Sequence, residues 1–332
     1  MVKKHLKNVI RKPNIEDKTK FDFILSQNER NLELPKELFK KFIDSIKFSD
    51  LAFYPNLNTL KSKIKKYSGC SNIILTPGSD IAIKTIFDIH NLEGKEVLTS
   101  EYYFPMYKVY TDIANAKLKT TDYNSDRLKI EDLINNINVN TKLILLANPN
   151  SPVGDTYTLK DIELLLEKGI PTVIDEAYIE ISNATSAIPL LKKYKNLFIT
   201  RTFSKGFGAA GCRVGYICSN KENIQILEKL RFMYEVSAIG GKYCEFILDN
   251  IKYFKSYTKE LLSAKSKYIK YLEQKKFFTI YDTNSSWFFL LKTAESDEFI
   301  ADKKISIKEV DLKFLGEGRW YKFNFDLKLI SK

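Results

Sequence analysis

Between Asn56 and Glu235 the chain alternates short apolar runs rich in β-forming residues with helical stretches. This alternation specifies an α/β fold with a largely parallel sheet. We therefore predict a three-layer sandwich with a mostly parallel central sheet. The runs expected to form strands are Glu96–Ser100, Leu118–Tyr123, Lys142–Asn148, Thr172–Ala177, Leu197–Phe203 and Arg213–Ser219.

The pattern changes after Ser237, where one long helical stretch is followed by short β-like pieces at Trp287–Lys292 and Trp320–Phe325. This second pattern indicates a smaller α+β domain, completed by the N-terminal residues. A chain of 332 residues can bury the core of one large domain or of two unequal ones. We predict a large domain over residues 47–236 and a small domain made of residues 1–46 with 237–332.

The chain is basic, with 53 lysines and arginines against 41 acidic residues and a net charge of +12. Such an excess is compatible with nucleic acid, a membrane surface or an anionic substrate as partner. The lysines are spread along the whole sequence, however, with acidic residues between many of them. This distribution is typical of a solvated surface, so we expect no nucleic acid and no membrane among the partners.

The sequence offers no pattern for a metal site or a membrane span. Its four cysteines show no CxxC spacing, and there are only two histidines, so a metal would lack ligands. No apolar run approaches the roughly 18 to 20 residues that cross a bilayer, and the first residues contain no apolar signal core. We expect reduced cysteines, no metal and a cytoplasmic location.

Four short segments carry polar residues at the ends of expected strands or the starts of helices, where open α/β sheets place their ligands. The first, Leu75 to Asp80, contains Gly78, Ser79 and Asp80 just before the apolar stretch Ile81–Ile89. A glycine turn that opens a helix presents free backbone N–H groups and the positive end of the helix dipole, which suit a phosphate. An ordinary helix N-cap explains this segment alone equally well.

The second segment, Val173 to Tyr178, is an apolar strand that ends in the acid Asp175. A carboxylate buried there is costly unless it meets a cation, and a protonated pyridine nitrogen would be such a partner. A strand-end aspartate that caps the next element is the alternative. The third segment, Ala147 to Gly154, is a turn-rich loop whose polar side chains could reach a bound hydroxyl group.

The fourth segment runs from Thr200 to Tyr216 and contains Lys205 among small and hydroxyl residues. A lysine at a strand end can lose its proton when desolvated and then attack an aldehyde, while Thr202, Ser204 and Arg213 could hold a phosphate. Residues 206–211 also match GxGxxG, the dinucleotide fingerprint. That motif needs a helix after its glycines, and the next strand is expected to begin at Arg213, so we reject nicotinamide binding.

In this order and at these separations, the motifs NPNSPVG, IDEAY and TRTFSKGFGAAGCRVGY resemble the fold-type I pyridoxal-phosphate (PLP) enzymes of aminotransferase class I/II. The similarity extends from about Leu25 to Ser237 and is strongest to the histidinol-phosphate aminotransferase-like branch. It implies the PLP-dependent transferase fold and pyridoxal 5′-phosphate as cofactor. It also implies that Lys205 forms the Schiff base and later moves a proton between the substrate α-carbon and the cofactor C4′.

The resemblance implies roles for further residues. Asp175 would pair with the pyridinium nitrogen, Tyr178 would hydrogen-bond the ring O3′, and Phe104 would stack on the ring face. Tyr54 would reach across a dimer interface to the neighbouring phosphate, which implies a homodimer with shared active sites. Phe104 and Tyr54 could also be plain packing residues. The residues implied around the cofactor phosphate are Gly78, Ser79, Asp80, Thr202, Ser204 and Arg213.

The sequence departs from the family pattern in three respects, one of which is an abbreviated C-terminal domain. Ser151 stands where the family usually has the asparagine that bonds O3′, so this contact is either shorter or made by Asn150. The arginine that grips a substrate α-carboxylate has no clear counterpart, and either Arg319 or Lys322 falls in its place. Arginine offers a bidentate fork and lysine a point charge. Strand alternation would put Tyr321 and Phe323 on one face and Lys322 and Asn324 on the other.

These features predict an aminotransferase that moves an amino group from a donor amino acid to a small phosphorylated carbonyl acceptor, such as imidazole-acetol phosphate or a three-carbon ketose phosphate. The main alternative is decarboxylation of a phosphorylated amino acid such as phosphoserine, because substrate orientation selects which α-bond breaks. A nucleic-acid binder or a catalytically silent regulator is a further alternative. Against it, the sequence shows no helix-turn-helix segment and no basic stripe interleaved with aromatic residues.

Overall fold

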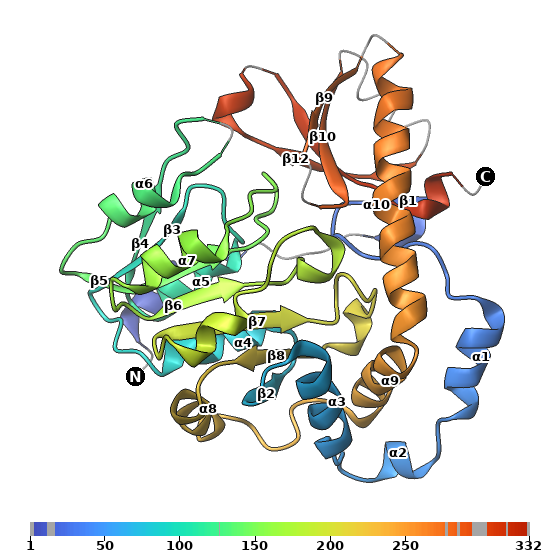
Figure 1. Cartoon of the computed structure of the whole chain (residues 1–332), viewed down its shortest axis with the longest axis horizontal. Coiled ribbons are helices and arrows are strands. Elements are labelled where there is room, and N and C mark those ends of the chain that lie inside the picture. The colour runs from blue at the N-terminus through green and yellow to red at the C-terminus, as the bar shows by residue number, and fades with distance from the viewer. Residues whose placement is uncertain are drawn as a thin grey trace.

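The computed structural model describes residues 3–11, 17–125, 127–275, 278–283, 286–293, 304–316 and 318–330. Its centre is a seven-stranded sheet in the order β2-β8-β7-β6-β5-β3-β4 (Figure 1). Neighbouring strands from β7 to β4 are parallel, whereas β8 is antiparallel to both β7 and β2. The strands are β2 (Ile73–Thr76), β3 (Glu96–Ser100), β4 (Lys117–Thr121), β5 (Thr141–Ala147), β6 (Thr172–Asp175), β7 (Leu197–Thr202) and β8 (Gly215–Cys218).

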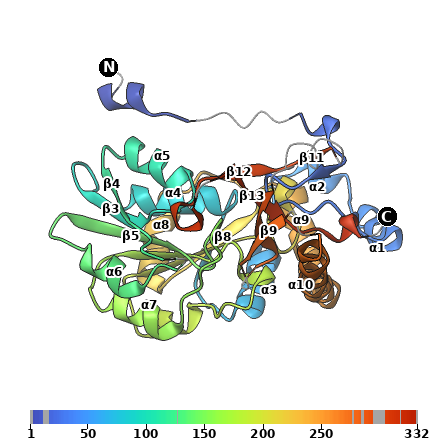
Figure 2. The same ribbon diagram turned by 90° about the horizontal axis from the view of Figure 1, so that it is seen from above.

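Helices cover both faces of this sheet, because side chains alternate along each strand. In β5, Leu143 and Leu145 belong to one core cluster, and Ile144 and Leu146 belong to the other. Figure 2 shows α4 and α5 on one side of the sheet and α6 and α7 on the other. The first cluster includes α4 (Ser79–Asp88), α5 (Met106–Ile113) and α8 (Lys221–Glu228); the second includes α3 (Asn58–Ser68), α6 (Ile130–Asn135), α7 (Leu159–Leu166) and α9 (Ala238–Asp249).

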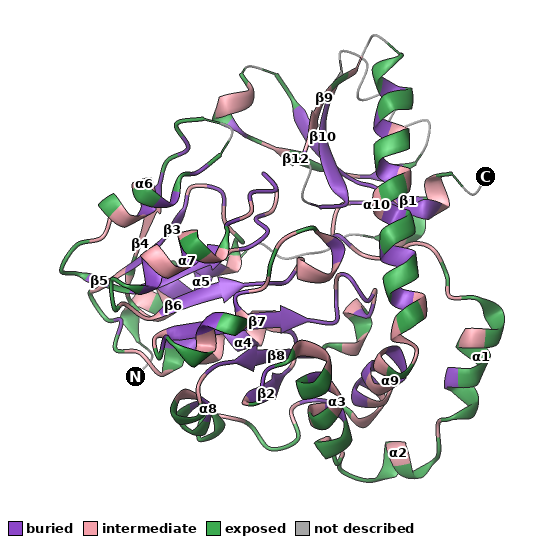
Figure 3. Ribbon diagram, in the orientation of Figure 1, coloured by how far each residue is buried: buried purple, intermediate pink, exposed green. Residues whose placement is uncertain are grey.

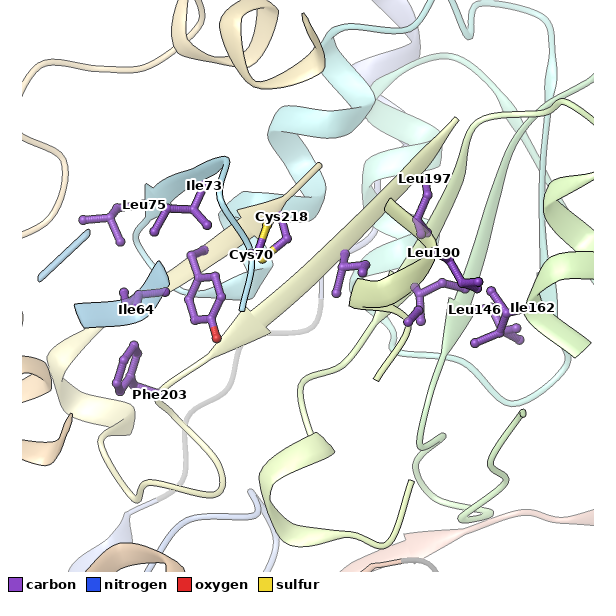
Figure 4. Close-up of a cluster of buried hydrophobic side chains, with 14 of the residues drawn as sticks. Ile64, Cys70, Ile73, Leu75, Leu146, Ile162, Leu190, Leu197, Phe203 and Cys218 are labelled. Atoms are coloured by element: carbon purple, nitrogen blue, oxygen red, sulfur yellow. The ribbon is translucent and has the colours of Figure 1, made fainter. Parts of the chain in front are cut away.

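The predicted three-layer sandwich is therefore confirmed, and the strand runs expected between residues 96 and 219 all form strands of the central sheet. In Figure 3 the inner strands are almost wholly buried, whereas the edge strand β4 is mostly half-buried and the helices alternate between buried and exposed faces. Figure 4 shows part of the second cluster, in which Ile64 of α3 and Ile162 of α7 lie among strand residues. Burial of each such side chain stabilises the fold by about 1.5 to 3 kcal/mol. The carboxyl ends of the strands, which bear the polar segments, are therefore held in place.

The rest of the chain forms a second, smaller layer. A four-stranded antiparallel sheet has the order β12-β13-β10-β9, and the long helix α10 (Ile251–Glu273) packs against β9. The short strand β1 (Phe23–Ile24) pairs in parallel with β11 (Ile305–Ser306), so N-terminal residues do join the C-terminal part. The four strands are β9 (Phe278–Asp282), β10 (Phe288–Thr293), β12 (Lys308–Val310) and β13 (Trp320–Asn324).

The predicted division into residues 47–236 and residues 1–46 with 237–332 stays a prediction. One observation bears on its second boundary: Cys244 and Ile247 of α9 belong to a core cluster of the central sheet. Helices α1 (Lys36–Asp44) and α2 (Ser49–Ala52) connect the N-terminal part to α3. Short 3-10 helices lie at Lys4–Asn8, Lys18–Lys20, Ile179–Ile181, Ile188–Lys192, Ala210–Cys212, Lys313–Leu315 and Leu327–Leu329.

Within the described residues, none of the helices combines the length and the apolar character that crossing a membrane requires. The same residues contain no group of three or more histidine, cysteine or acidic side chains that could hold a metal ion. All four cysteines, Cys70, Cys212, Cys218 and Cys244, are free thiols.

Candidate active site

Asp175 ends strand β6 at the carboxyl edge of the central sheet. The side chain is buried, and both of its oxygens accept hydrogen bonds: Oδ1 from Thr200 Oγ1 over 2.8 Å and Oδ2 from the Tyr107 hydroxyl over 3.0 Å. Burial raises the pKa of this carboxyl group above its usual value, and the hydrogen bonds from Thr200, Tyr107 and the Ala177 backbone oppose the rise. The carboxyl end of β6 thus holds a buried, oriented acid that favours a cationic partner.

Lys205 follows the next strand, β7, and its side chain lies largely inside the molecule. Nζ donates a hydrogen bond to the backbone carbonyl of Gln27 over 2.8 Å. Burial lowers the pKa of this lysine to about 8; the charge of Glu29 opposes the shift and that of Arg213 adds to it. Roughly one amine in ten is then neutral at pH 7, far more than for an exposed lysine. A neutral amine is the form that attacks an aldehyde.

Arg213 and Gly78 form a cradle beside the start of α4. Arg213 adopts a left-handed conformation (φ 53°), and its Nη2 donates to the Pro77 carbonyl over 3.3 Å. Nη1 lies 3.5 Å from Ser204 Oγ, which in turn accepts a hydrogen bond from Thr202 Oγ1 over 2.9 Å. Gly78 has a left-handed backbone (φ 85°), which favours glycine, and a Cβ atom there would come within 2.6 Å of Arg213 Nη2 and displace the guanidinium group.

This cradle has the properties of a phosphate site. A guanidinium group, the Ser204 hydroxyl and the free N–H groups at the N-terminus of α4 lie together, with Ser79 as the first helical residue. Asp80 stands in the first turn of the same helix, and its Oδ1 accepts a hydrogen bond from the Tyr110 hydroxyl over 2.7 Å. Its carboxylate is therefore engaged with α5, and its predicted place around a phosphate stays a prediction.

Tyr178 lies three residues beyond Asp175 and is partly buried. Its hydroxyl oxygen accepts a hydrogen bond from Asn28 Nδ2 over 2.5 Å. Burial raises the pKa of Tyr178 to about 12, and hydrogen bonds from Asn28 and Ser151 oppose the rise. Ser151 thus reaches the Tyr178 hydroxyl, whereas Asn150 donates to the Tyr102 carbonyl over 2.7 Å.

Asn150 and Phe104 lie at the ends of neighbouring strands. Asn150 is buried, and its Oδ1 has no hydrogen-bond partner among the described residues. Leaving a buried carbonyl oxygen without a hydrogen bond is costly. A donor group on a bound ligand would satisfy Asn150 Oδ1. Phe104, between β3 and α5, is 39% exposed and packs edge-on against Tyr107 with ring centroids 5.8 Å apart. Its predicted stacking on a bound ring stays a prediction.

The structure separates the two residues proposed to bind a substrate carboxylate. Lys322 is buried in β13, and its Nζ donates to Asn28 Oδ1 over 2.8 Å. Arg319 lies before this strand, exposed, and pairs with Glu309 over 3.2 Å. The geometry therefore brings Lys322, and not Arg319, to Tyr178. Asn324 contacts the same N-terminal segment as Lys322, and Phe323 packs in a hydrophobic cluster with β10. The predicted position of Tyr321 on the face of Phe323 stays a prediction.

Sequence reasoning missed several residues of this site. Thr200 could have been found, because it aligns with Asp175 across the β6–β7 pair. Tyr107 is typical of a core aromatic by its sequence, yet its hydroxyl donates a hydrogen bond to Asp175. Asn28 and the Gln27 carbonyl come from an irregular segment far away in sequence, and no periodicity marks them. The left-handed backbone of Asn28 (φ 58°) is a signal that only a structure reveals.

Taken together, the fold and these groups define an enzyme of the pyridoxal-phosphate class. The residues fit the cofactor: the Lys205 amine suits its aldehyde, the Arg213 cradle its phosphate, and the buried Asp175 its ring nitrogen. In this described part of the chain, no α-helix follows the glycines of the rejected nicotinamide motif: the short 3-10 helix Ala210–Cys212 overlaps the end of residues 206–211, and β8 begins at Gly215.

Comparison with known proteins agrees with this class. The family described as aminotransferase class I and II matches residues 22–311. The chain therefore belongs to the aminotransferase class I and II family. It is 36% identical over 218 residues to a histidinol-phosphate aminotransferase of Christiangramia forsetii, which covers 64% of this chain and 62% of that relative. It is 30% identical over 289 residues to that of Thermoanaerobacter pseudethanolicus, covering 83% and 80%.

Solved structures share the fold. The histidinol-phosphate aminotransferase from Sinorhizobium meliloti, in complex with pyridoxal-5′-phosphate, matches with a TM-score of 0.85 and 21% identity over 98% of this chain and 93% of that one. An L-threonine-O-3-phosphate decarboxylase from Porphyromonas gingivalis matches with a TM-score of 0.75 and 20% identity over 92% and 94%. The predicted family, fold and cofactor are thereby confirmed.

Proposed function

We propose that the protein is a PLP-dependent aminotransferase that moves an amino group from a donor amino acid to a small carbonyl compound. The observation that carries this proposal is the depressed pKa of Lys205, about 8, beside the Arg213 cradle and one strand from the buried Asp175. A cofactor-bound lysine must also take and return a proton, and a pKa near the working pH suits both directions.

When bound, pyridoxal phosphate supplies a ring that withdraws the electron pair of a broken α-bond. The side chains of the site would then have separate roles. Asp175 would keep the ring nitrogen protonated, while Thr200 and Tyr107 hold its carboxylate in place. Lys205 Nζ would move a proton between the substrate α-carbon and the cofactor C4′, and Arg213 would anchor the phosphate. Tyr178 would donate a hydrogen bond to the ring oxygen.

For the acceptor we propose a phosphorylated compound of the histidinol-phosphate or ketose-phosphate type. Support comes from the relatives named histidinol-phosphate aminotransferase. The net charge of +12 also favours an anionic substrate. In the same proposal, Lys322 meets the α-carboxylate of the amino donor, because its buried amine binds Asn28, which also binds Tyr178. The carboxylate would favour the charged form of Lys322.

The experiment is to incubate the PLP-loaded protein with glutamate and to measure 2-oxoglutarate release together with the change in cofactor absorbance. A stoichiometric burst of 2-oxoglutarate supports the proposal. The second candidate function is decarboxylation of a phosphorylated amino acid, favoured by the fold shared with the Porphyromonas gingivalis decarboxylase. Release of carbon dioxide from phosphoserine, with no 2-oxoglutarate from glutamate, would replace the first proposal with the second.

We further propose a homodimer with shared active sites. Tyr54 is 78% exposed, and its ring stacks on Tyr234 with centroids 4.1 Å apart. Both line an open groove of about 670 Å³. Large apolar side chains around it are exposed, a feature typical of interaction surfaces: Phe48, Leu51, Phe53, Phe232 and Met233.

Sedimentation should show twice the chain mass. Mixing two inactive variants, Tyr54→Ala and Lys205→Ala, gives the sharper test. If the sites are shared, mixed dimers contain one site with both wild-type residues, and activity returns. A monomer, or a dimer that shows no recovery on mixing after subunit exchange, would contradict shared sites.

The cytoplasm is the location we propose. All four cysteines are free thiols, which is typical of proteins in a reducing compartment. Cell fractionation with the tagged protein tests this: recovery in the soluble cytoplasmic fraction supports it, and recovery with membranes or in a secreted fraction contradicts it.

A further inference from the structure

Asn28 connects two residues of the site that come from different parts of the chain. Its Nδ2 donates to the Tyr178 hydroxyl oxygen over 2.5 Å, and its Oδ1 accepts from Lys322 Nζ over 2.8 Å. The side chain is 5% exposed. The amide oxygen thus faces Lys322 and the amide nitrogen faces the Tyr178 hydroxyl. The amide bridges these two partners.

This orientation determines what Tyr178 can do. Because Asn28 donates to the Tyr178 oxygen, the hydroxyl's own proton is available for a third group. Hydrogen bonds in a chain polarise one another, so the donor Lys322 strengthens the N–H of Asn28 as a donor, and Asn28 makes Tyr178 a stronger donor in turn. A carboxylate that favours the charged form of Lys322 would increase this effect. The three side chains form one directed relay from Lys322 to Tyr178.

The same amide compensates for a departure from the family sequence. Ser151 stands where the family usually has an asparagine, and it reaches Tyr178 with a hydroxyl group only. We propose that Asn28 is a positioning residue that supplies the missing amide from the N-terminal segment, holding the Tyr178 hydroxyl for the cofactor ring oxygen and Lys322 for the substrate carboxylate. This inference rests on the proposed function. It adds that Asn28 couples Tyr178, the residue for the cofactor ring oxygen, to Lys322, the residue for the substrate carboxylate.

The segment around Asn28 is held from both sides. The Gln27 carbonyl accepts from Lys205 Nζ, and the Leu25 carbonyl accepts from Asn324. Asn28 itself has a left-handed backbone (φ 58°), which asparagine and glycine adopt more readily than other residues. Asn28→Gly therefore removes the amide without adding backbone strain, and this makes it a clean test variant.

The experiment compares wild type with Asn28→Gly, Asn28→Asp and the double variant Asn28→Gly/Ser151→Asn. The matched control is Asn115→Gly, since Asn115 also has a left-handed backbone (φ 54°) but donates to Glu93 at the surface. Three quantities are measured: the pH midpoint of the absorbance change of bound cofactor without substrate, the dissociation constant of pyridoxal phosphate from cofactor-free protein, and the dissociation constant of glutamate.

The direction of each shift follows from the donors. In Asn28→Asp the new carboxylate can only accept hydrogen bonds, so the Tyr178 hydroxyl donates its hydrogen bond to residue 28. The same carboxylate forms an ion pair with Lys322, which then attracts the substrate carboxylate less strongly. The hydrogen bond that Tyr178 would donate to the cofactor ring oxygen disfavours a proton on that oxygen. Loss of this hydrogen bond therefore raises the pH midpoint of the absorbance change. We expect a higher midpoint and about tenfold weaker glutamate binding. Asn28→Gly should shift both values in the same direction by less, and Asn115→Gly should shift neither.

The double variant tests the substitution of one amide for the other. If Ser151→Asn returns the midpoint of Asn28→Gly toward the wild-type value, Asn28 does replace the family asparagine. If both Asn28 single variants keep the wild-type midpoint and glutamate constant, or if the double variant shows no recovery, the inference is wrong. A wild-type protein that binds no cofactor would instead contradict the proposed function.

Discussion

Thr200 and Asp175 lie side by side on the parallel strands β7 and β6, and Thr200 Oγ1 donates to Asp175 Oδ1 over 2.8 Å. Tyr107 holds the other oxygen, so the orientation of the carboxylate is fixed before any ligand arrives. Thr200 and Tyr107 are uncharged donors, so they orient the Asp175 carboxylate without neutralising its negative charge. A buried carboxylate held in this way suits a cationic partner such as the ring nitrogen of the proposed cofactor, which would be an example of electrostatic preorganisation.

Asp175→Asn should therefore separate cofactor binding from catalysis. The amide keeps the size of the side chain and one acceptor oxygen, but it cannot keep the ring nitrogen protonated. We expect the cofactor to bind more weakly and kcat with glutamate to fall by about a hundredfold or more. Asp249→Asn, at an exposed ion pair with Lys63, is the control. Near wild-type kcat in Asp175→Asn would show that the acid does not serve the ring.

The depressed pKa of Lys205 predicts how the stability of the cofactor-free protein depends on pH. The folded pKa of about 8 lies below the unfolded value of 10.5. The charged form is therefore penalised in the folded state below pH 8, and stability rises between pH 8 and 10.5 as the unfolded chain alone still binds the proton. Full relief of this penalty corresponds to up to about 3 kcal/mol.

Lys205→Met removes that penalty at all pH values. In cofactor-free protein, urea unfolding at pH 7 should show the variant more stable than wild type, and the difference should shrink above pH 10.5, where neither state of the wild type carries the charge. Lys193→Met, at an exposed ion pair, should show no comparable pattern. A difference that stays constant between pH 7 and 11 would mean that packing, not charge, separates the two proteins.

The residues found from sequence share one property: they lie within a few positions of a strand end. Asp175, Lys205 and Arg213 follow or precede apolar runs whose period and length indicate buried strands, and parallel strands bring their ends together. The position of Thr200 beside Asp175 follows from the same register. Local sequence was sufficient for these residues because the sheet itself sets their distances.

The contact between Asn28 and Lys322 cannot be predicted from local sequence. They are 294 positions apart, and their contact requires the N-terminal segment to pass between the two sheets. The period of two in β13 separates Lys322 from Tyr321, but only the pairing of β13 with β10 and β12 decides which face meets the site. Arg319 precedes that strand and is directed to Glu309 at the surface.

Arg213→Lys tests the phosphate cradle. Lysine keeps the positive charge but loses the planar fork that reaches both Ser204 and the Pro77 carbonyl. We expect the dissociation constant of pyridoxal phosphate to rise about tenfold or more, with a smaller effect on pyridoxal, which lacks the phosphate. Arg231→Lys, which pairs with Glu235, is the control. If the dissociation constants of pyridoxal phosphate and of pyridoxal rose by the same factor, Arg213 would act on a part of the cofactor other than the phosphate.

Lys322→Met and Arg319→Met separate the two candidates for the substrate carboxylate. Burial, first of all, and then the charges of Lys308 and Lys205 hold the pKa of Lys322 well below its usual value, so an arriving carboxylate would restore its charge. We expect Lys322→Met to raise KM for glutamate about tenfold or more with a smaller change in kcat, because a charged hydrogen bond to the substrate is lost. Arg319→Met should stay within about twofold of wild type, since its exposed pair with Glu309 contributes little. The reverse result, with Arg319→Met raising KM and Lys322→Met leaving it unchanged, would require Arg319 to leave Glu309 and enter the pocket when substrate binds.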